Sequence, residues 1–559
     1  MSSSESLFRN VEVKVPKRSG FDKSHMNLLT TKCGTLTPLL CDEVIPNTSV
    51  SLKINLSATL PPLASDTFMR CELKAEAFFV PYRICYGGFQ DWLQGNPVWS
   101  TTSAGKANAT FPVLEISSAS EVAPGTLSDY LGYKVNSTIT PSSLTRVNML
   151  PYIAYHKIYD EWYRNSLVQA PVFRQIRPSG SQAAANSNFY VNVGTLPSFT
   201  YNDSNDNTYN VISTSDTTRA SFADGVKITD LRQRNFGLDY FTTAQPQAQN
   251  GDAQKVSFTV PTSGTDAGNG SFTISALRAA NSMQQFLERN GLAGDRFVDY
   301  VKAHWGANLN DAIAQRPLLL GSASFDVYSK GIYQTANGTG TTNNPFDGSV
   351  GAQFGSAYAS GSDFIIKNFT ANEPGVIMVL VSLVPKVTYS TGVRRMLTHY
   401  IGTDPSSLFT GKVGGQTDMA TPLLQNVGNQ PIYSYELDGN LNSGNVFGYT
   451  DRYAEWKTME DELHGLLRDG QSLESFALQR TFANNSAPTI ATAFLKIPTD
   501  YMDQVTAAND SISNYGVWID SYLDYKVSMP LSRYAVPSLQ DPAYEHGEDV
   551  SIQRAGTHL

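Results

Sequence analysis

A strict alternation of apolar and polar residues between positions 50 and 60 constrains the fold of this chain more than any other feature. Every even position from Val50 to Leu60 is apolar and every odd position is polar, which is typical of a half-buried strand. The alternation resumes from Cys71 to Phe79. Burying a large aliphatic side chain is worth roughly 1.5 to 3 kcal/mol, so this face must be covered. We expect a pair of strands bordering a core.

Other segments also have the patterns of strands. Residues 256–260 and 523–529 alternate, and residues 376–384 are almost continuously apolar, as in a strand that is buried on both faces. Only 16% of residues are charged, and 42 glycines and 28 prolines favour turns and irregular loops. The sequence therefore predicts a mainly β protein with long loops and few helices.

Three segments have helical spacing of apolar residues. Residues 151–165 carry an aromatic stripe, which we expect to pack on the sheet rather than to bind a ligand. Residues 275–290 carry Leu277, Ala280, Met283 and Leu287 on one side. A third helix is expected over residues 451–467.

The chain divides into three parts in this interpretation. Residues 1–20 form an extended arm, in which Val11, Val13 and Val15 alternate with Glu12 and Lys14. Residues 21–539 form one domain with loop-like insertions at about 174–238, 331–362 and 402–420. Residues 540–559 form a tail.

The formal net charge of −9 argues against a surface that binds nucleic acid over its whole extent. Any such contact must be local, and Lys14, Lys17 and Arg18, with Phe8 and Phe21 nearby for base stacking, are the candidates. The alternative, that these residues only make a terminus soluble, remains open.

Motifs of enzymes and membrane proteins are not found. No secretory signal or membrane-spanning run is present. The four cysteines do not have the spacing of a metal or redox site, so we expect them to be reduced and to act as small apolar side chains. Glu460 and His464 are one helical turn apart, but a zinc site needs more protein ligands. We expect no enzymatic activity, no metal and no cofactor.

A series of short motifs in a constant order resembles the major capsid protein family of the Microviridae (F-protein family), and its gokushovirus branch in particular. The motifs are residues 18–25, 34–38, 43–46, 78–83, 129–132, 150–152, 158–164, 239–242, 315–317, 388–392, 448–455 and 530–537. The segment between Arg174 and Asp239 is longer than is usual in this family. The stretch from Gln247 to Phe272, where gokushoviruses often carry a threefold protrusion, is shorter.

The resemblance implies an eight-stranded antiparallel jelly-roll β-barrel with long insertions. It also implies a structural protein of the virion that is made and assembled in the bacterial cytoplasm. Sixty copies would form a T=1 icosahedral shell around circular single-stranded DNA. The implied partners are other copies of the chain, the DNA, a small basic DNA-binding protein, a minor or pilot protein and a bacterial surface receptor met by surface loops. The alternative from another class is a carbohydrate-binding or carbohydrate-active jelly roll.

Overall fold

The computed structural model describes most of the chain between residues 18 and 531. The described ranges are 18–86, 113–134, 145–172, 226–248, 274–333, 353–398, 429–506 and 516–531, with short gaps inside them, and a few residues elsewhere, including the short strands at 97–99, 106–108, 200–202 and 208–210. The strand expected at residues 256–260, the insertion expected at 402–420 and the tail lie outside the described residues.

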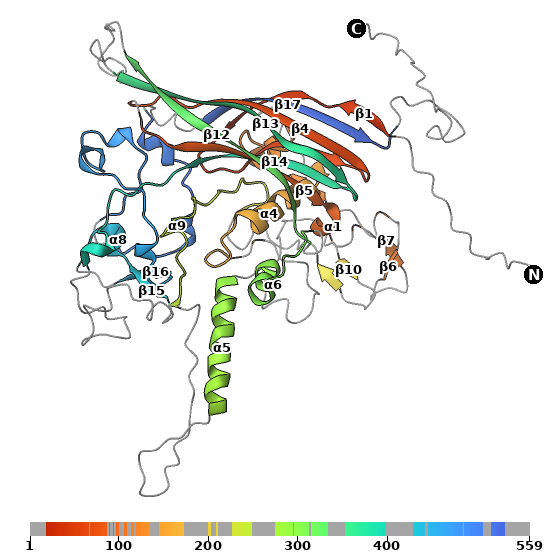
Figure 1. Cartoon of the computed structure of the whole chain (residues 1–559). Helices are drawn as coiled ribbons and strands as arrows, with labels where there is room; N and C mark the ends of the chain where they lie inside the picture. Colours follow the sequence, from red (N-terminus) through yellow and green to blue (C-terminus); the bar gives the residue numbers. More distant parts are fainter. Residues whose placement is uncertain are drawn as a thin grey trace, which may run out of the picture.

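One curled antiparallel sheet forms the body of the molecule (Figure 1). Its order is β1-β17-β4-β13-β12-β5-β14-β3, and β2 pairs with β17 next to β1 along the same edge. The strands are β1 Ser19–Asp22, β2 His25–Thr31, β3 Thr37–Val44, β4 Thr48–Thr59, β5 Cys71–Pro81, β12 Leu318–Tyr333, β13 Gln353–Ala371, β14 Gly375–Pro385 and β17 Val517–Met529. The predicted mainly β, jelly-roll-like class is confirmed. The sheet has nine strands in the described part of the chain, so the predicted count of eight is not confirmed.

Helices and short hairpins flank this sheet. The helices are α1 Tyr82–Cys85, α3 Leu127–Tyr130, α4 Leu150–Ile158, the π-helix η2 Tyr159–Tyr163, α5 Ile274–Ala293, α6 Phe297–Trp305, α8 Tyr435–Asp438 and α9 Thr492–Leu495. Single 3₁₀ turns are η1 Ala119–Glu121, η5 Arg395–Thr398, η7 Ala454–Trp456, η8 Gly465–Leu467, η9 Glu474–Phe476 and η10 Tyr501–Gln504. Small antiparallel pairs join β6 Pro97–Trp99 to β7 Lys106–Asn108, β8 Val113–Ile116 to β9 Thr145–Asn148, β10 Thr200–Asn202 to β11 Thr208–Asn210 and β15 Gln430–Tyr433 to β16 Val446–Thr450.

The alternation predicted from the sequence explains which face of the sheet is buried. In β4 the apolar even positions from Val50 to Ala58 are buried, and in β17 the odd positions from Val517 to Val527 are buried. The two predicted strands β4 and β5 are not hydrogen-bonded neighbours, however, because β13 and β12 lie between them. The expected pairing is therefore wrong, although both strands border the same core.

A second core lies between the sheet and the aromatic helix. Side chains of β5 and β14, such as Phe78 and Met378, pack with Tyr152, Tyr155 and Tyr159 of α4 and η2. Figure 1 shows α4 beneath this part of the sheet. The prediction that the stripe packs on the sheet is confirmed.

Part of the segment that was expected to be an insertion at 331–362 is strand. β12 and β13 pair from Val327–Ala359 to Tyr333–Gln353, and residues 334–352 lie outside the described residues. Small residues occupy the positions of β13 that face the core here. A Cβ atom at the buried Gly355 would lie 2.2 Å from the Ser65 carbonyl oxygen, and one at the half-buried Gly361 would lie 2.3 Å from the Phe325 ring. Glycine and serine are typical of loops, but in β13 their small size permits close packing against the neighbouring segments.

The helix expected over residues 451–467 is also wrong. The structure has only the short turns η7 and η8 there, and Tyr453 and Gly465 have positive φ angles of 63° and 67°. The Tyr389 amide donates to the Asp461 carbonyl, and the Leu463 amide donates to the Tyr389 carbonyl. Because these backbone groups bind a distant segment, they are not used for helical bonds.

The edges formed by β2 and β3 approach each other without a regular ladder. At one end the hydroxyl oxygens of Thr31 and Thr37 lie 2.6 Å apart. In the middle the Asn27 amide donates to the Leu39 carbonyl at 2.8 Å. At the other end the Asp42 carboxylate accepts bonds from Lys23 at 2.5 Å and from the Tyr525 hydroxyl at 2.8 Å. Side chains therefore hold this seam together.

Candidate functional site

The most prominent surface feature is the helical pair α5 and α6. Figure 1 shows α5 pointing away from the sheet, with α6 near its base. The two helices contact each other, and the rings of Phe286 and His304 lie 4.9 Å apart. The helix expected over residues 275–290 is therefore confirmed, with one more turn.

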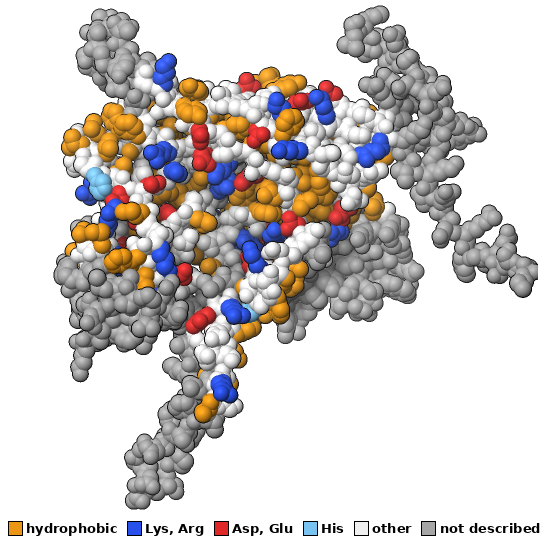
Figure 2. Space-filling model, viewed as in Figure 1, with side chains coloured by type: hydrophobic (Ala, Val, Ile, Leu, Met, Phe, Trp, Pro, Cys, Tyr) orange, Lys and Arg blue, Asp and Glu red, His pale blue; other side chains and the backbone are white. Residues whose placement is uncertain are grey.

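The apolar side chains of this pair are largely exposed. Ile274, Met283, Phe297 and Trp305 are between 51% and 69% exposed, and Figure 2 shows apolar side chains along the projecting helix. Exposed large apolar groups that lie close together are typical of interaction surfaces.

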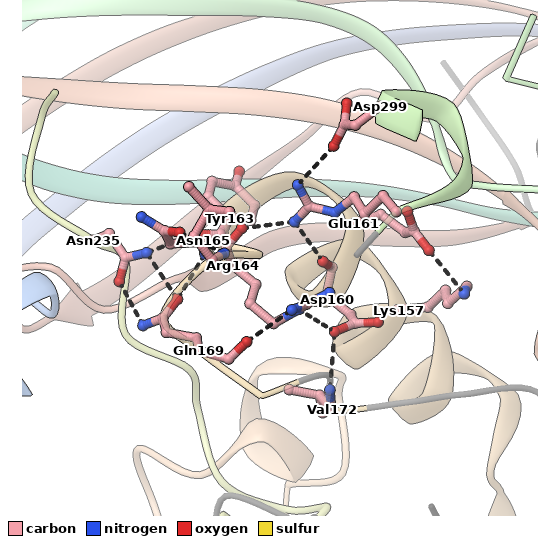
Figure 3. Close-up of polar contacts among 12 residues, drawn as sticks. Lys157, Asp160, Glu161, Tyr163, Arg164, Asn165, Gln169, Val172, Asn235 and Asp299 are labelled. Atoms are coloured by element: carbon pink, nitrogen blue, oxygen red, sulfur yellow. Dashed lines mark hydrogen bonds and ion pairs between the residues drawn. The ribbon is translucent and has the colours of Figure 1, made fainter. Parts of the chain in front are cut away.

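Arg296, which precedes α6, anchors the pair to the body of the molecule, and Figure 3 labels its partners Asp160, Arg164 and Asp299. Its Nη2 atom donates to the carbonyl oxygens of Asp160 at 2.8 Å and Arg164 at 2.6 Å. Its Nη1 atom lies 3.8 Å from the Asp299 carboxylate. Burial lowers the pKa of this guanidinium from its usual value, yet a guanidinium remains charged at any physiological pH.

The carbonyls that receive Arg296 belong to a local distortion of the aromatic helix. At Tyr159 the α-helix changes to a π-helix, whose last hydrogen bond runs from the Arg164 amide to the Tyr159 carbonyl at 3.1 Å. Such bulges often occur at functional positions. Here the bulge turns two carbonyl groups toward α6.

A buried ion pair holds this bulge in place. The Arg164 Nε atom lies 2.7 Å from the Asp160 carboxylate, and both side chains are at most 6% exposed. The same carboxylate accepts the Val172 amide at 2.9 Å, and Arg164 Nη1 donates to the Gln169 carbonyl at 2.8 Å. The loop after the helix is therefore bound to the helix itself.

An amide pair extends the network to a third segment. The side chains of Gln169 and Asn235 bind each other at 3.0 Å, and Asn235 also donates to the Tyr163 carbonyl at 3.0 Å. Nearby, Arg234 donates to Glu76 of β5 at 2.7 Å. Segments around residues 76, 160, 170, 235 and 296 are thus joined into one rigid support.

The outward face of the sheet is a second candidate surface. Exposed aromatic side chains of β12, β13 and β17 lie on the side opposite the first core: Tyr328, Tyr358, Phe364, Trp518 and Tyr522. The rings of Tyr328 and Tyr358 lie 6.2 Å apart. Sequence reasoning identified only residues 523–529 of β17 as a strand and did not identify β12 or β13, so it missed this face, although the alternation of β17 places Trp518 and Tyr522 outward.

The structure describes two of the five residues that were predicted to contact DNA. Arg18 is exposed and donates to the Ser528 carbonyl at 3.1 Å and to the Asn47 side chain at 3.3 Å. Phe21 is half-buried in β1, opposite the buried Val527. Phe8, Lys14 and Lys17 lie outside the described residues. Of the five residues the structure describes Arg18 and Phe21, and the role of all five stays a prediction.

A small cavity of about 220 Å³ is lined in part by the buried Glu436. Burial raises the pKa of Glu436 to about 7, although the Arg395 guanidinium, 3.5 Å away, acts in the opposite direction. The Tyr240 hydroxyl and the Tyr433 amide donate to this carboxyl group at 3.1 Å and 3.0 Å. Because hydrogen-bond donors occupy both carboxyl oxygens of Glu436, we interpret this carboxyl group as a structural link between the segments around it.

The described ranges were expected to hold no metal site, and the geometry of their histidines, cysteines and acids is as follows. No cluster of three or more histidine, cysteine or acidic side chains is present there. His464, which is 81% exposed, lies 3.2 Å from Glu462 rather than pairing with Glu460 on a helix. The four cysteines are free, and burial raises the pKa of Cys41 and Cys85 to about 12. No helix in the described part of the chain is long and apolar enough to span a membrane.

Comparisons with known proteins relate this chain to capsid proteins of small phages. The family model of the capsid protein (F protein) matches residues 10–539. The capsid protein VP1 of Chlamydia phage 1 is 25% identical, with 95% of this chain and 97% of the relative covered. VP1 of Bdellovibrio phage phiMH2K is 22% identical over 93% and 95%, and VP1 of Spiroplasma virus 4 is 24% identical over 94% and 95%.

These relatives are Microviridae proteins, and Chlamydia phage 1 is a gokushovirus, as the sequence motifs predicted. The relatives are structural proteins, and the comparisons do not favour the carbohydrate alternative. The match over nearly the whole chain shows that it belongs to the F-protein family of Microviridae capsid proteins and has the role of a structural major capsid protein of the virion.

Proposed function

We propose that sixty copies of this chain form a T=1 icosahedral shell around a circular single-stranded DNA genome, assembled in the cytoplasm of the host bacterium. The family match over residues 10–539 is the observation that supports this proposal most strongly. A rigid antiparallel sheet with large insertions suits a subunit that makes several different contacts with its copies.

Negative-stain electron microscopy of the purified protein tests the assembly. Uniform closed particles, with DNA that resists nuclease until the particles are opened, are the expected result. A protein that stays monomeric at high concentration under all assembly conditions would contradict the proposal.

In this proposal the basic arm contacts the packaged DNA, together with a small basic DNA-binding protein and a minor or pilot protein. Lys14→Gln with Lys17→Gln removes two charges and preserves the bonds of Arg18 to Ser528 and Asn47. We expect fewer genomes per particle while shells still form. The matched control neutralises Lys302 and Lys457, which have the same charge and lie elsewhere. Equal packaging in both double variants would contradict a role of the arm in DNA packaging.

We also propose that the exposed part of α5 and α6 belongs to the surface that meets the bacterial receptor. Its support is the exposed apolar side chains on a firmly anchored projection. Phe297→Ser and Trp305→Ser are expected to lower adsorption of particles to host cells without lowering particle yield. Normal adsorption would contradict this role.

A further inference from the structure

A cavity with a basic wall lies at the base of α6. It has a volume of about 840 Å³ and is enclosed by α6, the π-helix η2, the end of β14 and residues 234–238. Five cations and one acid form its charged lining: Lys74, Arg164, Arg234, Arg296, Lys302 and Asp299. A cavity of this size with a few polar groups in a partly apolar lining is typical of a site for a small ligand.

Three of the five cations have carboxylates of their own. These ion pairs are Arg164–Asp160 at 2.7 Å, Arg234–Glu76 at 2.7 Å and Lys74–Glu72 at 3.1 Å. The two remaining cations, Arg296 and Lys302, lie just before α6 and within it. They are therefore the cations of the cavity that can bind an additional negative charge.

Arg296 has unused capacity for an anion. Its Nη1 atom lies 3.8 Å from the Asp299 carboxylate (Figure 3), which is longer than a hydrogen bond. Its Nε atom is buried and has no hydrogen-bond partner among the described residues. Burial lowers the pKa of this guanidinium and the nearby Arg164 lowers it further, although Glu161, Asp299 and Asp160 act in the opposite direction. An anion beside the two guanidinium groups would reduce their mutual repulsion.

Lys302 provides a second point of attachment. It is exposed and forms no ion pair or hydrogen bond with any residue in the described part of the chain. It follows Asp299 by three positions in α6, so the two side chains share one face of the helix, and both line the cavity. An ammonium group has three donors, and all three are available here.

From these observations we propose that Arg296 and Lys302 bind one phosphate group in this cavity, and that a sugar of the bacterial envelope carries this group. A phosphate monoester has three terminal oxygens and can bridge two cations, whereas a carboxylate has only two. Leu238, which is 86% exposed and lines the same cavity, provides an apolar contact for the sugar ring. The inference rests on the proposed receptor surface, because Phe297 and Trp305 of that surface belong to the same helix.

The cavity suits one phosphate better than a strand of DNA. Single-stranded DNA has a phosphate at every nucleotide and binds to continuous basic grooves with aromatic rings on which bases stack. Trp162 and Tyr163 line the cavity, but the Arg316 guanidinium covers the Trp162 ring at 4.5 Å and Arg234 covers the Tyr163 ring at 5.1 Å. Their faces are thus already partly occupied.

Calorimetric titration of the purified full-length chain with N-acetylglucosamine 1-phosphate tests the site. We expect a Kd of about 1 mM or lower at low ionic strength, and binding of N-acetylglucosamine that is weaker by about tenfold. Lys302→Gln should weaken binding of the sugar phosphate by about tenfold, the effect of losing roughly one charge-assisted contact. Lys457→Gln, at an equally exposed position outside the cavity, should leave the Kd unchanged.

A substitution with the opposite expected sign distinguishes binding from a structural role. Asp299→Asn removes the acid that faces the bound phosphate, so the Kd should fall by about threefold. Circular dichroism shows whether each variant is folded. A weaker affinity in both Lys302→Gln and Asp299→Asn would indicate damage to α6 rather than loss of a contact, and would overturn the inference.

The titrations have further outcomes that would overturn the inference. One is the absence of binding at about 10 mM sugar phosphate, and another is an equal loss of affinity in Lys302→Gln and Lys457→Gln. A short oligothymidylate distinguishes the two sources of phosphate. If it binds more tightly than the sugar phosphate and loses this affinity in Lys302→Gln, the cavity belongs to DNA and not to the envelope.

Adsorption of particles to host cells separates this inference from the proposed function. Lys302→Gln particles should adsorb about tenfold less well, and free N-acetylglucosamine 1-phosphate should compete with adsorption of the wild type. Normal adsorption of Lys302→Gln together with reduced adsorption of Phe297→Ser would overturn the inference and leave the proposed receptor surface intact. If Lys302→Gln, Phe297→Ser and Trp305→Ser all adsorb normally, the receptor surface and the inference both fail.

Discussion

Replacing Asp160 by asparagine tests how the support beneath α5 and α6 is held together. Asparagine has nearly the same shape and can still accept the Val172 amide, so the substitution mainly removes one charge. Arg164 then remains buried, with its partner at 2.7 Å no longer negative. Removing one member of a buried ion pair typically costs about 3 to 5 kcal/mol.

The structure places this substitution toward the lower part of that range. Arg164 retains its bond to the Gln169 carbonyl, and the asparagine oxygen still faces its Nε atom. We therefore expect the free energy of unfolding to fall by about 3 kcal/mol. Urea denaturation of unassembled subunits, followed by far-ultraviolet circular dichroism, measures this change.

A double variant separates the missing charge from a general loss of packing. In Asp160→Asn with Arg164→Met neither charge remains, so we expect the double variant to be more stable than Asp160→Asn by about 1 to 2 kcal/mol. A loss below about 1 kcal/mol for Asp160→Asn would refute the reasoning, since it would mean that solvent already screens the pair. A double variant whose loss equals the sum of two damaging single changes would refute it as well.

Three further predictions follow from other parts of the molecule. Trp162→Ala should lower the free energy of unfolding by about 3 kcal/mol, because the half-buried indole packs on the second core and donates to the Pro317 carbonyl at 2.9 Å; Trp162→Phe should lose about 1 kcal/mol, and equal losses would contradict the role of this bond. Gly321→Ala should cost at least about 1 to 3 kcal/mol, because its Cβ would lie 2.1 Å from the Ile365 carbonyl oxygen, and an unchanged denaturation midpoint would show that this part of the sheet is looser than described. The pKa of Glu436 is raised to about 7 in the folded chain from its usual 4.5, so its contribution to stability is complete below pH 4.5 and is lost as pH rises to 7; stability measured across this range should fall more with pH in the wild type than in Glu436→Gln, and parallel curves would show that this carboxyl group is already ionised.

The strands were predicted well where a side chain of one kind repeats at every second position. In β4 and β17 large apolar residues alternate with polar ones, and burial follows the same alternation. In the first half of β13 the buried positions are Gly355, Ala357 and Ala359, and the half-buried Gly361 continues the alternation. Their small size results from the closeness of the segment beneath, which is distant in the sequence, so hydrophobicity alone could not reveal this strand.

The candidate site was predictable only in its local parts. The aromatic stripe of residues 151–165 and the amphipathic pattern of α5 indicated two helices, because helical spacing is a local property. The π-helical turn at Tyr159 and the support of α6 depend on Arg296, Gln169 and Asn235, which belong to three separate segments. No local pattern relates these residues. The break in the helix expected over 451–467 likewise depends on Tyr389, a distant residue.

The seam between β2 and β3 is the line along which the sheet of the subunit deforms most easily. Across neighbouring strands elsewhere, deformation must break a row of backbone bonds together, whereas among the described residues the seam has side-chain links at Thr31, Asn27 and Asp42 in place of a backbone ladder. A lateral load on the subunit therefore widens this line before it disturbs any ladder. The sheet is therefore stiff where its strands are joined by backbone hydrogen bonds and more compliant along the seam between β2 and β3.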